Sequence, residues 1–155
     1  MMPKYQKLLV VTDLSPLGNA AVPHAYAILA ERGGTVILCH VIDTEGTPDS
    51  LYAQPMPGKS LSEQRAGLRE ALFSSLEALV PEEARAEEKV TTEVRVVDAR
   101  SVYEAICQEA ANLEVDLVVM ASHGYSGLKH MLLGSVAEHV VRSADRPILI
   151  VRSRG

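Results

Sequence analysis

The chain has 155 residues, of which 47% are hydrophobic and 23% charged, and its formal net charge is −5. This length fits one domain, residues 1–155, and the apolar content is sufficient for a buried core. An acidic chain without a block of lysine or arginine argues against nucleic acid as a partner. No apolar run approaches the roughly 18 residues of a membrane span, so we expect a cytoplasmic protein with no membrane partner.

Five strand-like runs alternate with four helix-like segments, which predicts a parallel sheet with helices on both faces. Four of the runs are almost continuously apolar, as in strands that are covered on both faces. The third alternates apolar and polar residues, which predicts an edge strand. The strands are expected at residues 7–12, 35–42, 90–97, 116–121 and 147–152. We therefore predict an α/β fold, a single doubly wound, Rossmann-like domain with strand order 3-2-1-4-5 and four helices.

The expected helices are marked mainly by their first residues. Ser15 before Pro16 predicts the first helix, and Pro23 within that helix predicts a kink or a delayed start. Capping-box spacing predicts three further starts, at Ser60-Leu-Ser-Glu63, Ser101-Val-Tyr-Glu104 and Ser135-Val-Ala-Glu138. Residues 43–59, rich in Pro, Gly and Asp, predict a long loop, and the charged residues 81–89 predict a solvated linker.

The most informative stretch is the glycine-bearing turn of residues 120–136, between the fourth strand and the last helix. Glycines let the backbone turn tightly, and a helix N-terminus directs free N–H groups and a partial positive charge at one point. This arrangement predicts a phosphate site built from Gly124, Gly134 and Ser135. The same residues could instead simply turn the chain and cap the helix.

Position in the predicted sheet favours the functional interpretation. In a doubly wound sheet, ligands bind at the carboxyl ends of the strands where the winding reverses, here the first and fourth strands. Those ends carry Thr12 and Asp13 on one side and the glycine turn on the other. Asp13 could accept hydrogen bonds from a ribose or adenine, or reach Mg²⁺ through water, or only form an Asx turn.

Other site types are disfavoured. The segment Ala53-Gln-Pro-Met-Pro-Gly-Lys-Ser60 resembles a P-loop, but its prolines lack the N–H groups that a phosphate cradle needs. Residues 12–19 lack the glycine fingerprint of dinucleotide-binding enzymes. The histidines show no metal-binding spacing, and Cys39 and Cys107 lie in apolar segments as expected of buried thiols. We predict no catalytic residue and no metal ligand.

The chain resembles the universal stress protein family over nearly its whole length. The nucleotide-binding branch of that family carries Gly-x2-Gly-x9-Gly followed by Ser or Thr, and Ala121, Gly124, Gly134 and Ser135 stand at these positions. Alanine thus replaces the first glycine of the motif. The segments Val10-Val-Thr-Asp-Leu-Ser15 and Cys39-His-Val-Ile42 also resemble the family.

The resemblance implies an ATP- or AMP-binding stress-response protein, usually a homodimer, without a well-established catalytic activity. It implies a ribose and adenine site at Thr12 and Asp13, and an adenine edge read by the Val41 backbone. The remaining implied contacts are Met120 against the base, Ala121, Ser122, His123 and Gly124 along the sugar and phosphates, and Gly134, Ser135 and Val136 at the phosphate tail. Mg²⁺ is a further candidate ligand.

Two alternatives remain open from the sequence. One is a dimeric interaction module that binds no nucleotide, and the other is a slow ATPase with Mg²⁺ near Asp13. The apolar strand Ile148–Val151 is expected at a sheet edge, where it could pair with a second copy of the chain in a homodimer.

Overall fold

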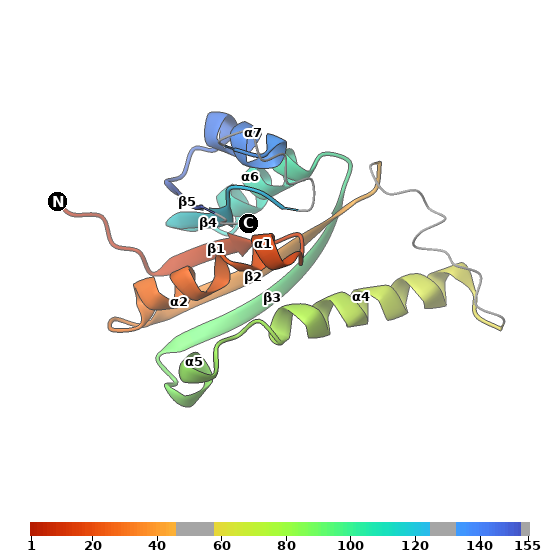
Figure 1. Ribbon diagram of the computed structural model, residues 1–155, viewed down its shortest axis with the longest axis horizontal. Helices are drawn as coiled ribbons and strands as arrows, with labels where there is room; N and C mark the ends of the chain where they lie inside the picture. The colour runs from red at the N-terminus through yellow and green to blue at the C-terminus, as the bar shows by residue number, and fades with distance from the viewer. Residues whose placement is uncertain (46–57, 125–132, 153–155) are drawn as a thin grey trace.

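The computed structural model describes residues 1–45, 58–124 and 133–152 (Figure 1). Its five strands are all parallel and lie in the order β3-β2-β1-β4-β5, which confirms the predicted topology. The strands are β1 (Lys7–Val11), β2 (Gly34–Asp43), β3 (Val90–Ala99), β4 (Leu117–Ala121) and β5 (Ile148–Val151). Most of the predicted long loop and the middle of the glycine turn lie outside the described residues.

The described helices are α1 (Pro16–Asn19), α2 (Val22–Leu29), α4 (Leu61–Glu77), α5 (Glu82–Ala86), α6 (Val102–Asn112) and α7 (Ser135–Ser143). The four of eight residues or more, α2, α4, α6 and α7, correspond to the four predicted helices. The linker predicted at residues 81–89 is instead partly helical, because Pro81 starts the five-residue helix α5, which buries no side chain.

The first helix is interrupted as Pro23 predicts. Ser15 accepts a hydrogen bond from the Gly18 N–H and caps α1, but α1 ends after four residues. The chain then restarts at Val22, with Pro23 in the first turn of α2, where a missing N–H costs no helical hydrogen bond. Proline therefore sets the start of α2 rather than a kink within one longer helix.

The other predicted starts differ in how the serine acts. Ser60 forms the full capping box, since Glu63 N–H donates to Ser60 Oγ at 3.3 Å and Ser60 N–H donates to Glu63 Oε2 at 2.8 Å. Ser101 stands at the predicted N-cap position of α6 without a side-chain hydrogen bond to the helix. Spacing thus located both starts, although only one serine caps its helix through the side chain.

Two apolar cores lie on opposite faces of the sheet. Alternate residues of β1 divide between them, with Leu8 and Val10 on one face and Leu9 and Val11 on the other. The first core packs against α2 and against Leu76, and the second against α6 and α7, which Figure 1 shows on the other side of the sheet. The strands β1, β2 and β4 are near-continuous apolar runs because both of their faces are covered.

The edge position predicted for β3 is confirmed, and an arginine of α4 covers part of that edge. Arg69 donates to the Val96 carbonyl at 2.6 Å and pairs with Asp98 at 2.7 Å. A filled backbone acceptor and a fixed charge make an exposed strand a poorer template for pairing with other chains.

The two thiols differ in burial. Cys39 is fully buried in β2, and this burial raises the pKa of its thiol to about 12. Cys107 is half-buried on α6, and burial also raises the pKa of its thiol. Both thiols are therefore protonated at neutral pH, which makes neither a nucleophile. In the described part of the chain, no helix is both long enough and apolar enough to cross a membrane.

Candidate functional site

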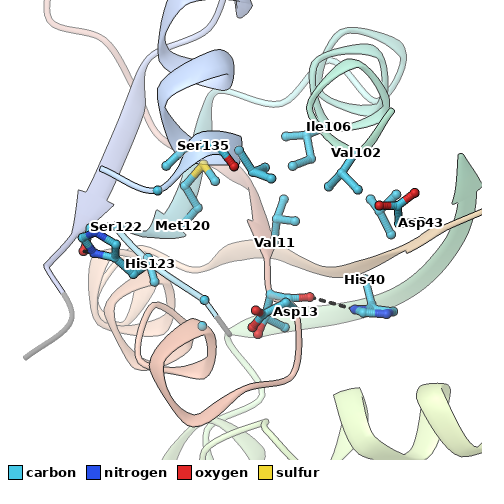
Figure 2. A pocket seen from close by; sticks show the side chains of 18 residues that line it. Val11, Asp13, His40, Asp43, Val102, Ile106, Met120, Ser122, His123 and Ser135 are labelled. Atoms are coloured by element: carbon cyan, nitrogen blue, oxygen red, sulfur yellow. Dashed lines mark hydrogen bonds between the residues drawn. The ribbon is translucent and has the colours of Figure 1, made fainter. Parts of the chain in front are cut away.

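A pocket of about 650 Å³ opens at the carboxyl ends of β1 and β4, where the winding of the sheet reverses (Figure 2). The structure brings together around it every residue named from the sequence: Thr12, Asp13, Val41, Met120, Ala121, Ser122, His123, Gly124, Gly134, Ser135 and Val136. Their gathering at one pocket is a finding of the structure, and their contacts with a nucleotide stay a prediction.

One half of the pocket is apolar. Figure 2 shows Val11 and Met120 from the sheet facing Val102 and Ile106 from α6 across the same space. Val11 and Met120 belong to the second core, so this half of the pocket continues the apolar layer between the sheet and α6. The faces of a flat, weakly polar ring fit such a space, because burying them removes apolar surface from water.

The opposite wall is the turn that follows β1. Asp13 Oδ1 accepts hydrogen bonds from the backbone N–H of Ser15, at 3.0 Å, and from its hydroxyl, at 2.5 Å. Thr12 Oγ1 accepts from the N–H of Leu14, at 3.0 Å, and Leu14 has a φ of 66°. A leucine in this conformation is strained, and such strain persists where surrounding hydrogen bonds hold it. The turn therefore holds the Asp13 carboxylate in a fixed orientation at the pocket.

His40 fixes the same turn from β2. Its Nδ1 lies 2.9 Å from the Thr12 carbonyl oxygen, the dashed contact in Figure 2. A carbonyl oxygen can only accept, so Nδ1 carries the proton and donates it.

The third wall is the start of α7, and it corrects the predicted role of Ser135. The N-cap residue is Gly134, with φ −65° and ψ 163°, and Ser135 is the first residue within the helix. The Glu138 N–H donates to the Gly134 carbonyl and closes the first turn. Ser135 therefore does not cap the helix, and its hydroxyl lies exposed on the pocket wall.

The first turn of α7 offers hydrogen-bond donors. Gly134 N–H donates to the Ser122 carbonyl at 2.7 Å. No carbonyl of the helix can reach the N–H groups of Ser135, Val136 and Ala137, because the helix begins there. These three residues line the pocket, so the wall combines N–H groups that have no acceptor among the described residues with the positive end of the helix dipole.

The loop after β4 completes the site. Ser122 N–H donates to the Val151 carbonyl at 2.8 Å, which ties this loop to β5. His123 Nδ1 lies 3.0 Å from Ser122 Oγ, while His123 Nε2 is buried and has no hydrogen-bond partner within the described residues.

Alanine in place of the first motif glycine fits the strand without strain. Ala121 ends β4, and only Leu14 and Glu114 have positive φ among the described residues other than glycine. Its methyl group belongs to the first core, whereas Met120 belongs to the second core, which forms the apolar half of the pocket. The extra methyl therefore points to the other face of the sheet from that half.

Sequence reasoning missed part of the lining: Val11, Gly18, His40, Asp43, Val102, Ile106 and Ala137. Val11 had a signal, because it directly precedes Thr12. Asp43 had one as well, because it lies two residues after Val41. Val102 and Ile106 had none, because only the packing of α6 against the sheet brings them to the pocket.

Fold and site together define a class: doubly wound α/β proteins with a ligand pocket at the switch point of a parallel sheet. Within that class, the universal stress protein family model matches residues 4–152. The chain belongs to the universal stress protein family.

Two relatives of similar length align with almost the whole chain. The chain is 30% identical to the universal stress protein MJ0577 of Methanocaldococcus jannaschii, covering 97% of this chain and 96% of that protein. It is 29% identical to the universal stress protein YxiE of Bacillus subtilis, covering 96% and 99%. The solved structure of MJ0577 superposes with a TM-score of 0.79 over 97% of this chain and 98% of that chain, at 28% identity. A universal stress protein solved in complex with cAMP has the same fold, with a TM-score of 0.64 and 24% identity over 97% and 98% of the two chains.

Proposed function

We propose that this protein binds an adenine nucleotide, ATP or AMP, in the pocket between β1 and β4 and acts as a cytoplasmic regulatory protein of the stress response. The observation that carries the proposal is the pairing of two unlike halves in one pocket. An apolar half continues the second core, and a donor-rich half is formed by the start of α7. An adenine nucleotide has the same two-part character, a flat ring at one end and anionic phosphate at the other.

The proposed contacts follow the two halves. The adenine lies against Val11 and Met120, with its edge at the Val41 backbone. The ribose lies at Thr12 and Asp13, whose carboxylate accepts hydrogen bonds from sugar hydroxyls. The sugar and phosphates pass Ala121, Ser122, His123 and Gly124, and the phosphate tail ends at Gly134, Ser135 and Val136. Mg²⁺ is proposed as a counter-ion of the phosphates, since the described charged side chains of the pocket wall are the carboxylates Asp13 and Asp43.

Binding can be tested directly. We expect the purified protein, once denatured, to release ATP or AMP identifiable by mass spectrometry, and the emptied protein to bind both in calorimetry. Ser135→Ala should weaken AMP binding roughly 10- to 100-fold, because one hydrogen bond to a charged group is lost, and leave adenosine binding unchanged. Ser143→Ala, an exposed serine at the other end of α7, is the matched control. No calorimetric response to ATP, ADP, AMP or cAMP would disprove the proposal.

We also propose a homodimer formed through β5. This strand is a sheet edge of four residues, and its Leu149 is 36% exposed. An exposed apolar edge strand is satisfied when it pairs with a second copy across a two-fold axis. Sedimentation velocity should show a dimer that Leu149→Glu shifts towards monomer. Leu61→Glu, at a 49% exposed leucine of α4, should leave the dimer intact, and a monomeric unmodified protein would refute this proposal.

A further inference from the structure

Two glycines from distant parts of the chain enclose the Asp13 carboxylate. A Cβ atom built on Gly18 would overlap Asp13 Oδ1, and one built on Gly124 would overlap Asp13 Oδ2 and lie 2.8 Å from Asp13 Cγ. Gly18 belongs to α1 and Gly124 follows β4, so the carboxylate fills space that both segments leave empty. A side chain at either position would compete with Asp13.

The backbone at Gly124 does not itself require glycine. Positive φ among the described glycines occurs at Gly33, Gly34 and Gly58, so Gly124 has a conformation that other residues can adopt. The three atoms nearest to a Cβ at Gly124 all belong to Asp13. What excludes a side chain at this position is thus the Asp13 carboxylate.

Asp13 cannot move aside without cost. Both Ser15 donors bind Oδ1, and this places Oδ2 over Gly124. A methyl group at residue 124 would rotate the carboxylate away and break its hydrogen bonds to Ser15. Because the displaced group is the end of one side chain, the fold itself can absorb the change, whereas the orientation of Asp13 at the pocket cannot survive it.

We infer that Gly124 is a positioning residue for the nucleoside half of the ligand, acting through Asp13, rather than a residue that clears space for phosphate. The inference rests on the proposed function, since it assigns the Asp13 carboxylate to the ribose. It separates two glycines of one motif. Gly134 lies against the Ser122 carbonyl, at 3.2 Å from a built Cβ, and serves the phosphate end, while Gly124 serves the sugar.

A double-mutant cycle with two ligands tests the inference. Adenosine and AMP are titrated by calorimetry into the unmodified protein, Gly124→Ala, Asp13→Ala and the double variant. We expect Gly124→Ala and Asp13→Ala each to weaken adenosine binding roughly 10- to 100-fold, the range for a lost hydrogen bond to a charged group. The double variant should bind no more weakly than Asp13→Ala alone, because the methyl group then has room.

A control variant on α4 and the binding of the two ligands separate this inference from its alternatives. Gly67→Ala makes the same change on α4, where nothing lies within 4 Å of the new Cβ, and should leave binding of both ligands unchanged. Unchanged adenosine binding but weakened AMP binding in Gly124→Ala would overturn the inference in favour of phosphate clearance, as would additive losses in the double variant. If the unmodified protein bound neither ligand, the proposed function would fail, and the inference with it. Thermal unfolding of each variant checks that the fold is retained.

Discussion

Gly134→Val is expected to weaken AMP and ATP binding by more than roughly 100-fold while the protein remains folded. A Cβ at this position would lie 3.2 Å from the Ser122 carbonyl oxygen and 3.7 Å from His123 Cα. The two further methyl groups of valine would push the start of α7 away from the loop after β4 and occupy the proposed phosphate space. The φ of −65° is open to valine, so the backbone can keep its course, at the cost of a poorer N-cap.

Calorimetry with AMP and adenosine measures the effect, and thermal unfolding shows whether the fold survives. Gly67→Val is the matched control, because Gly67 lies on α4 with nothing within 4 Å of a built Cβ. AMP affinity within threefold of the unmodified protein would place the phosphate elsewhere and remove α7 from the proposed site.

Leu76→Ala is expected to lower the free energy of unfolding by about 3 kcal/mol, or the melting temperature by roughly 6–12 °C. Leu76 is 0% exposed and is the one fully buried residue of α4. Truncation removes buried methyl groups and leaves a cavity between α4 and the sheet, where the first core cannot readily collapse. The loss is large because α4 has few other apolar contacts to replace it.

Chemical denaturation of Leu76→Ala and Leu61→Ala gives the comparison. Leu61 lies at the other end of α4 and is 49% exposed, so its truncation should change stability by less than about 0.5 kcal/mol. Equal effects at the two leucines would mean that α4 is not anchored where the structure places it.

The strand order could be predicted because the sequences of β1, β2 and β4 are apolar runs, whereas β3 alternates apolar and polar residues. Both patterns follow from whether one or two faces are covered. The break at Pro23 could be predicted too, because a missing N–H is tolerated only in the first turn of a helix. The helix α5 was missed because its five charged and small residues include only one partly buried side chain, Ala84, and leave no periodic signal.

The position of the candidate site could be predicted from strand ends and glycine spacing, but its detailed geometry could not. The spacing of Ser135 and Glu138 in the sequence matches a capping box. The first turn of α7 nevertheless begins one residue earlier, with a hydrogen bond to the Gly134 carbonyl. His40 reaches the site through a hydrogen bond to Thr12, a contact between neighbouring strands that neither segment reveals alone. Which glycine faces Asp13 also depends on how the turn after β1 meets the loop after β4. The spacing of glycines in the sequence contains no information on that contact.

The walls of the pocket come from opposite ends of the chain. β1 pairs directly with β4, and Lys7 N–H bonds to Asp116 across 109 residues of sequence. During synthesis, Thr12 and Asp13 leave the ribosome long before the loop after β4 and α7 exist. A nascent chain therefore has half a site and gains nothing from a ligand, since stabilisation by binding requires the native pocket. A ligand therefore stabilises only chains that contain both walls of the pocket. Molecules that lack their C-terminal third gain no stability from it.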